Sequence, residues 1–106
     1  MVDNVSTMPY IYIMKTFRWN TDKNELLLQK RGITFEEIVQ KIESGAKYFE
    51  NDHPNKLKYP NQKIIIIEID EYVFLVPCVI TGNEYFLKTI IPSRKATKQY
   101  LGGKNE

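Results

Sequence analysis

The pattern of apolar and polar positions divides the chain into a helical first part and a β-rich second part. Residues 1–9 carry no periodic pattern, and residues 1–14 are expected to form a tail or one extra strand. Phe17 and Trp19 alternate with polar neighbours, which predicts a short strand over 15–19. The three leucines at 26–28 then give the following segment the apolar side of a helix.

Capping signals mark the ends of two consecutive helices. Three residues can cap the first helix: Asn20, Thr21 and Asp22. Gly32 ends that helix, and Thr34 with Glu37 forms a Thr-x-x-Glu capping box at the start of the second. The apolar residues of the second helix follow the spacing of one buried stripe: Phe35, Ile38, Val39 and Ile42.

Short apolar segments separated by turn residues predict four strands in the second half: 47–50, 63–69, 72–80 and 84–91. A polar loop spans 51–62. Pro77 has no N–H for a β-ladder, so we expect a bulge or a locally unpaired edge there. Ser93 caps a final helix that ends near Leu101. The predicted class is α+β in the order β-α-α-β-β-β-β-α, with a twisted antiparallel sheet and helices packed on it.

Composition narrows the class of protein. A length of 106 residues corresponds to one domain, which is expected over 15–102 with a tail at 103–106. A single cysteine excludes an internal disulfide framework and favours a reducing compartment. No apolar run approaches the ~20 residues of a membrane-spanning helix, and no secretory signal is evident. We therefore expect a soluble cytoplasmic protein that acts away from membranes.

Few residues suggest catalysis by a cofactor, a metal or a thiol. No glycine-rich phosphate loop occurs, and one cysteine with one histidine cannot give the spacing of a metal site, so no cofactor is expected. Cys78 lies in an apolar strand and is expected to be a core thiol. His53 precedes Pro54 in a polar loop, where it is either a surface residue or an acid–base group. Glu36 and Glu37 serve the cap and dipole of a helix.

Basic residues give a more specific signal, although the net charge is only +2. Lys30 and Arg31 close the first helix. Lys88 is placed by simple alternation on one face of a strand with Phe86 and Ile90, which is unusual for a core face. Several cations then follow before any acid: Arg94, Lys95, Lys98 and Lys104. A basic corner between a strand and a helix can hold RNA phosphate, and it can equally be a solvated face.

Two segments of the sequence resemble the BrnT toxins. The first contains Phe17-Arg18-Trp19-Asn20 and then Lys30-Arg31-Gly32-Ile33-Thr34-Phe35-Glu36-Glu37. It is similar to the family's Phe-x-Trp-Asp followed by Lys-His-Gly-Val-Ser-Phe-Glu-Glu. The second, Lys88-Thr89-Ile90-Ile91-Pro92-Ser93-Arg94-Lys95-Ala96-Thr97, is similar to Arg-x-Ile-Ser-Ala-Arg-x-Ala-Thr. The two segments bracket most of the chain.

The resemblance implies a fold related to the RelE and ParE toxins. It also implies a type II toxin that acts on RNA and blocks translation, paired with an antitoxin, often a ribbon-helix-helix protein. By position it assigns the catalytic cations as Lys88, Arg94, Lys30 and Arg31. The neighbouring residues that we expect to bind RNA are Lys95, Lys98, Tyr100 and His53. Arg31 stands at the family's histidine and Lys88 at its strand arginine.

The activity expected from this resemblance is metal-independent RNA cleavage, in which fixed cations stabilise the phosphorane. Candidate proton carriers are Tyr100, His53 and Glu37. A non-catalytic binding module that acts with the antitoxin as a co-repressor is the alternative. A gyrase poison of the ParE type is a third possibility on the same fold. Trp19 can stack on a base, although core packing is the more common role of such a residue.

Overall fold

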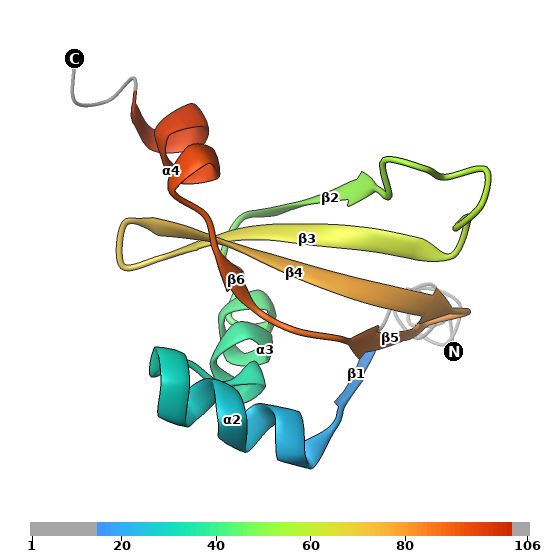
Figure 1. The fold of residues 1–106 in the computed structure, drawn as a ribbon, viewed down its shortest axis with the longest axis horizontal. Coiled ribbons are helices and arrows are strands. Elements are labelled where there is room, and N and C mark those ends of the chain that lie inside the picture. Colours follow the sequence, from blue (N-terminus) through green and yellow to red (C-terminus); the bar gives the residue numbers. More distant parts are fainter. Residues whose placement is uncertain (1–14, 103–106) are drawn as a thin grey trace, which may run out of the picture.

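Three helices and six short strands make up the computed structural model, which describes residues 15–102 (Figure 1). The predicted tails at 1–14 and 103–106 lie outside the described residues. The elements in chain order are β1 (Thr16–Trp19), α2 (Thr21–Arg31), α3 (Phe35–Glu43), β2 (Tyr48–Asp52), β3 (Gln62–Ile69), β4 (Tyr72–Thr81), β5 (Glu84–Leu87), β6 (Ile91–Pro92) and α4 (Arg94–Leu101). The predicted α+β class is confirmed.

The predicted capping residues begin and end the helices. The Asn20 side chain accepts a hydrogen bond from the Lys23 N–H, and Gly32 closes α2 at a left-handed φ of 68°. The Thr34 side chain accepts from the Glu37 N–H, and the Ser93 side chain accepts from the Ala96 N–H. These local bonds explain why the helix ends could be predicted from short motifs.

The sheet is mixed, and the expectation of a purely antiparallel sheet is wrong. Its strand order is β1-β5-β4-β3-β2, and β6 pairs with β4. All pairs are antiparallel except β1 with β5, which is parallel, with Phe17 beside Tyr85. After β1 the chain forms the two helices and then the strands β2 to β5. β1 pairs with β5 and forms the edge of the sheet opposite β2, and it runs parallel to β5.

The predicted strand over 84–91 is interrupted opposite Pro77. The Lys88 N–H donates to the Pro77 carbonyl over 2.8 Å, but proline has no N–H to return the bond. The register then shifts between the Cys78–Leu87 pair and the Leu75–Ile91 pair, so two residues of β4 oppose three residues at 88–90. This bulge was one of the two expected consequences of Pro77.

The bulge also changes which side chains share a face. Simple alternation placed Lys88 with both Phe86 and Ile90, and this assignment is wrong for Ile90. Ile90 is fully buried, whereas Phe86 and Lys88 are exposed. The extra residue rotates the chain by one position and directs Ile90 into the core, leaving Lys88 on the opposite side of the sheet.

Helices α2 and α3 cover one face of the sheet, below it in Figure 1, and α4 lies on the opposite side. The main core forms under α2 and α3, where Phe35 and Ile38 pack against Ile65 and Leu87. A smaller cluster forms under α4, where Ala96 packs with Ile66 and Val73. No helix within residues 15–102 has the length and apolar character needed to cross a membrane. Because α4 is short, much of its side of the sheet has no helix over it.

Candidate functional site on the uncovered sheet face

The side of the sheet that α2 and α3 leave free is called the open face. Strand alternation and register place its residues in rows that run from β2 toward β1. The first row, which includes the residue after β2, is His53, Gln62, Val79, Phe86 and Arg18. The second row is Asn51, Ile64, Pro77 and Lys88. The third row is Phe49, Ile66, Leu75 and Ile91.

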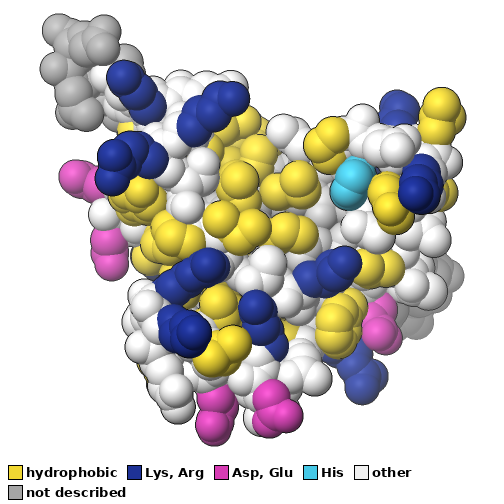
Figure 2. Space-filling view, in the orientation of Figure 1, with side chains coloured by type: hydrophobic (Ala, Val, Ile, Leu, Met, Phe, Trp, Pro, Cys, Tyr) yellow, Lys and Arg dark blue, Asp and Glu magenta, His cyan; other side chains and the backbone are white. Residues whose placement is uncertain are grey.

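The open face is therefore apolar in its centre and polar at its two sides. Figure 2 shows hydrophobic side chains gathered in a hollow over the sheet, with Lys and Arg side chains around them. Phe86 and Ile91 are 39% and 38% exposed, which is high for large apolar side chains in a sheet. Lys88 and Arg18 lie at the β5–β1 side, whereas Asn51 and His53 lie at the β2 side.

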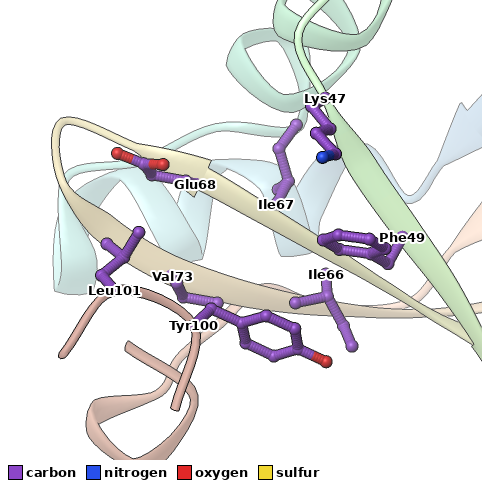
Figure 3. Close-up of a pocket in the computed structure, with 8 residues that line it drawn as sticks. All are labelled: Lys47, Phe49, Ile66, Ile67, Glu68, Val73, Tyr100 and Leu101. Atoms are coloured by element: carbon purple, nitrogen blue, oxygen red, sulfur yellow. The ribbon is translucent and has the colours of Figure 1, made fainter. Parts of the chain in front are cut away.

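Helix α4 closes one end of the open face. The Tyr100 ring stacks on Phe49 with 5.5 Å between the ring centroids, and the Lys47 ammonium lies 5.7 Å from the Phe49 centroid. A pocket of about 260 Å³ opens beside these rings, lined further by Ile66 and Leu101 (Figure 3). Tyr100 is thus part of the packing between α4 and β2 and also a wall of this pocket.

The segment 88–94 carries the predicted catalytic cations along the edge of the open face. Lys88 lies in the bulge and Arg94 is the first residue of α4. The Arg31 guanidinium at the end of α2 donates a hydrogen bond to the Ile90 carbonyl, which ties the helix to the bulge. The structure therefore brings Arg31 beside the segment that links Lys88 to Arg94.

The remaining predicted site residues are less closely gathered. Lys30 is exposed in the last turn of α2. Lys95 and Lys98 are exposed on α4. None of the predicted cations, Lys30, Arg31, Lys88, Arg94, Lys95 and Lys98, forms an ion pair with another residue between 15 and 102. Such cations keep their charge available for an anionic ligand.

Candidates assigned other roles also have clear positions. Glu37 lies on α3, across the sheet from Lys88, so the open face cannot use it as a proton carrier. Trp19 packs against the core and stacks on Phe35, 5.7 Å away, which confirms its packing role. Cys78 is buried and only 1% exposed, as expected of a core thiol. Among residues 15–102, no group of three His, Cys, Asp or Glu residues is placed to hold a metal ion.

Sequence reasoning missed three polar residues of the open face: Arg18, Asn51 and Gln62. Arg18 stands between Phe17 and Trp19, which face the core, so alternation alone puts it on the opposite side. The signal for Arg18 was present in the sequence. That it lies beside Phe86 depends on the parallel pairing of β1 with β5.

A second polar cluster lies on the other side of the sheet and was also missed. The Lys15 ammonium donates to the Tyr48 hydroxyl over 2.6 Å and pairs with the Glu50 carboxylate at 3.2 Å. The Tyr85 hydroxyl donates to Glu50 over 2.9 Å. Burial lowers the pKa of Lys15, but the hydrogen bonds to Tyr48 and Glu50 outweigh it and raise that pKa overall. The cluster ties β2 to β5 on the side of the sheet that faces the main core.

Stability is expected to fall in alkaline solution because of two buried groups. Burial and the nearby Glu50 raise the pKa of Cys78 to about 11. Burial and the bond to Glu50 raise the pKa of Tyr85 to about 12. Both groups are more acidic when the chain unfolds, with ordinary values of 9.0 and 10.0. Their contribution is complete below about pH 9 and is lost as the pH rises to 12, by about 2–3 kcal/mol each.

Urea unfolding followed by tryptophan fluorescence between pH 8 and pH 12 measures this loss. Cys78→Ala should reduce the slope of stability against pH between 9 and 11, and Tyr85→Phe should reduce it between 10 and 12. Slopes equal to that of the parent protein in both variants would contradict the assignment.

The chain has no match among models of protein families, curated proteins or solved structures.

Proposed function

We propose that the open face binds single-stranded RNA and that the protein is a metal-independent endoribonuclease of the BrnT toxin type. The observation that carries the proposal is the edge formed by segment 88–94, where Lys88 and Arg94 border an exposed apolar sheet. An apolar sheet face accepts unstacked bases, and adjacent cations accept the phosphates between them. The resemblance of two sequence segments to BrnT toxins supports the same function and a topology of the RelE kind.

The chemistry requires a group that stabilises extra negative charge on phosphorus. The 2′-hydroxyl of the substrate attacks the adjacent phosphate, its proton leaves to a base, and the 5′-oxygen of the next nucleotide departs with a proton. This yields a 2′,3′-cyclic phosphate. Arg94 and Lys88 are proposed to hold the charge of the phosphorane. Arg31, fixed at the Ile90 carbonyl, keeps further N–H donors for a neighbouring phosphate.

The proposal also includes a partner and a cellular setting. An antitoxin protein, of the ribbon-helix-helix kind in the resembling family, would cover the open face and neutralise the toxin in the cytoplasm. One observation favours the alternative of a non-catalytic co-repressor. The open face is apolar in its centre and bordered by polar groups, which is also the character of a protein-binding surface.

Induced expression of the full chain distinguishes the two functions. A ribonuclease is expected to arrest growth and fragment total RNA. The purified protein should also cut a single-stranded RNA in excess EDTA and leave cyclic phosphate ends. Soluble protein that neither arrests growth nor cuts RNA would overturn the ribonuclease and favour the binding module. DNA damage signalling with intact RNA would overturn it in favour of a gyrase poison.

A further inference from the structure

The loop between β2 and β3, residues 53–61, is much longer than a hairpin needs and is bonded internally. Two residues are enough to connect antiparallel strands. Here the Tyr59 N–H donates to the Asn55 carbonyl over 2.9 Å within the loop. The Ile80 N–H of β4 donates to the Asn61 carbonyl over 2.8 Å and ties the end of the loop to the sheet. The His53 and Tyr59 rings lie 4.6 Å apart. A long loop with a fixed internal structure is typical of a binding element.

One hydrogen bond in this loop determines where the imidazole of His53 carries its proton. The Asn55 N–H donates to Nδ1 of His53 over 2.9 Å. Nδ1 must therefore be unprotonated, and the neutral ring carries its hydrogen on Nε2. The loop thus presents Nε2–H as a hydrogen-bond donor whose direction is set by the Asn55 backbone and the Tyr59 ring.

His53 shares a corner of the open face with two carboxamides. The backbone N–H of His53 donates to the backbone carbonyl of Gln62 over 3.1 Å, which places the two residues opposite each other where β2 ends and β3 begins. Asn51 lies two positions earlier on the same face. The side chains of Asn51 and Gln62 form no hydrogen bond with other residues in 15–102. Carboxamides offer donors and acceptors without charge, as the recognition of base edges requires.

The position of this corner separates it from the cations. Three strand spacings and one step along the strand separate His53 from Lys88, roughly 15 Å between their Cα atoms. His53 and Lys88 therefore lie at opposite sides of the open face, and we expect them to contact different nucleotides of one bound strand. The apolar residues between them, Ile64, Pro77 and Val79, supply a surface on which the intervening nucleotides can lie.

We propose that His53, Gln62 and Asn51 form a subsite that reads one nucleobase of the RNA, a few nucleotides away from the phosphate held by Lys88 and Arg94. This inference rests on the proposed function and adds that cleavage depends on the identity of a base displaced from the cut. The base accepts a hydrogen bond from Nε2–H of His53, and its remaining edge pairs with the carboxamides.

The experiment digests a random-sequence single-stranded RNA pool with purified protein and sequences the new ends. The parent protein is expected to enrich one base at a fixed distance from the cut. His53→Asn is the main variant, because its side-chain oxygen can still accept the Asn55 N–H while Nε2–H is lost. It should cut more weakly, with at least a tenfold loss of that enrichment. Leu57→Ala is the matched control, since Leu57 is 94% exposed at the tip of the same loop.

Each outcome has one meaning. Enrichment that disappears in His53→Asn and persists in Leu57→Ala supports the subsite. The subsite is overturned if the parent protein cuts RNA without enriching any base away from the cut. It is also overturned if His53→Asn keeps the enrichment. Either result leaves the proposed ribonuclease activity standing. If the parent protein neither cuts nor binds the pool, the proposed function fails, and the subsite fails with it. Thermal unfolding of His53→Asn near that of the parent shows that the loss is not one of folding.

Discussion

Arg94→Ala is expected to abolish growth arrest and to reduce RNA cleavage by about 10²–10³-fold, as loss of one donor to a developing negative charge does elsewhere. Arg94 is exposed at the first position of α4, so its removal should shift the free energy of unfolding by less than about 0.5 kcal/mol. The cleavage rate of purified protein on single-stranded RNA, together with growth after induction, measures the effect. Arg94→Lys should recover part of the activity, because lysine keeps the charge but not the paired donors.

Lys41→Ala is the matched control for Arg94→Ala. Lys41 is an exposed cation in the last turn of α3, on the helix that covers the other face of the sheet. Lys41→Ala removes one positive charge, as Arg94→Ala does, so a general electrostatic effect on RNA binding would appear in both variants. Normal arrest and cleavage in Arg94→Ala, at equal protein levels, would remove Arg94 from the site.

Phe35→Ala is expected to lower the free energy of unfolding by about 3–5 kcal/mol. The Phe35 side chain has no exposed surface and stacks on Trp19, and its N–H donates to the Asn24 side chain over 2.7 Å. Its truncation leaves a cavity between α3 and the sheet. Because the free energy of unfolding of a native protein is only about 5–15 kcal/mol, Phe35→Ala removes a large share of it.

Urea unfolding followed by fluorescence of the single Trp19 measures this change. Leu28→Ala is the control, since Leu28 on α2 is 52% exposed and should cost less than about 0.5 kcal/mol. A loss below about 1 kcal/mol for Phe35→Ala would mean that the main core is not organised around α3 as described.

The parts of the fold that depend on neighbouring residues could be predicted from the sequence. Capping side chains act within three residues, so short motifs identify Thr34 and Ser93 and narrow the first cap to three candidates, of which Asn20 is the one used. The gap of two residues between the strands predicted at 63–69 and 72–80 also indicates a tight turn at Asp70 and Glu71. Both residues have positive φ values, 55° and 65°, as a two-residue hairpin turn requires.

Features that depend on distant pairing could not be predicted in the same way. The direction of β1 relative to β5 follows from the path of the whole chain, which no local pattern contains. Pro77 indicated a break in the strand pairing, but the placement of Ile90 in the core depends on which of the two paired strands contains the extra residue. Alternation by itself gives the wrong face there.

The residues of the candidate site also divide into those that a local pattern indicates and those that only distant pairing brings together. Lys88 and Arg94 were identified from sequence because they lie six positions apart in one segment. The corner of His53, Gln62 and Asn51 was not, because its members come from two strands and a loop. His53 alone gave no reason to look at Gln62 until the register of β2 on β3 was known.

The parallel pairing of β1 with β5 has a consequence for synthesis of the chain. Thr16 pairs with Glu84, so the first strand waits for the last fifth of the sequence before it gains its neighbour. At about 5–20 residues per second, the helical half exists for seconds before the sheet is complete. Lys88 and Arg94 are made after that same point. Nascent chains that end before this point therefore lack both the closed sheet and the basic edge, and the proposed RNA chemistry begins only after residues 84–94 have been translated.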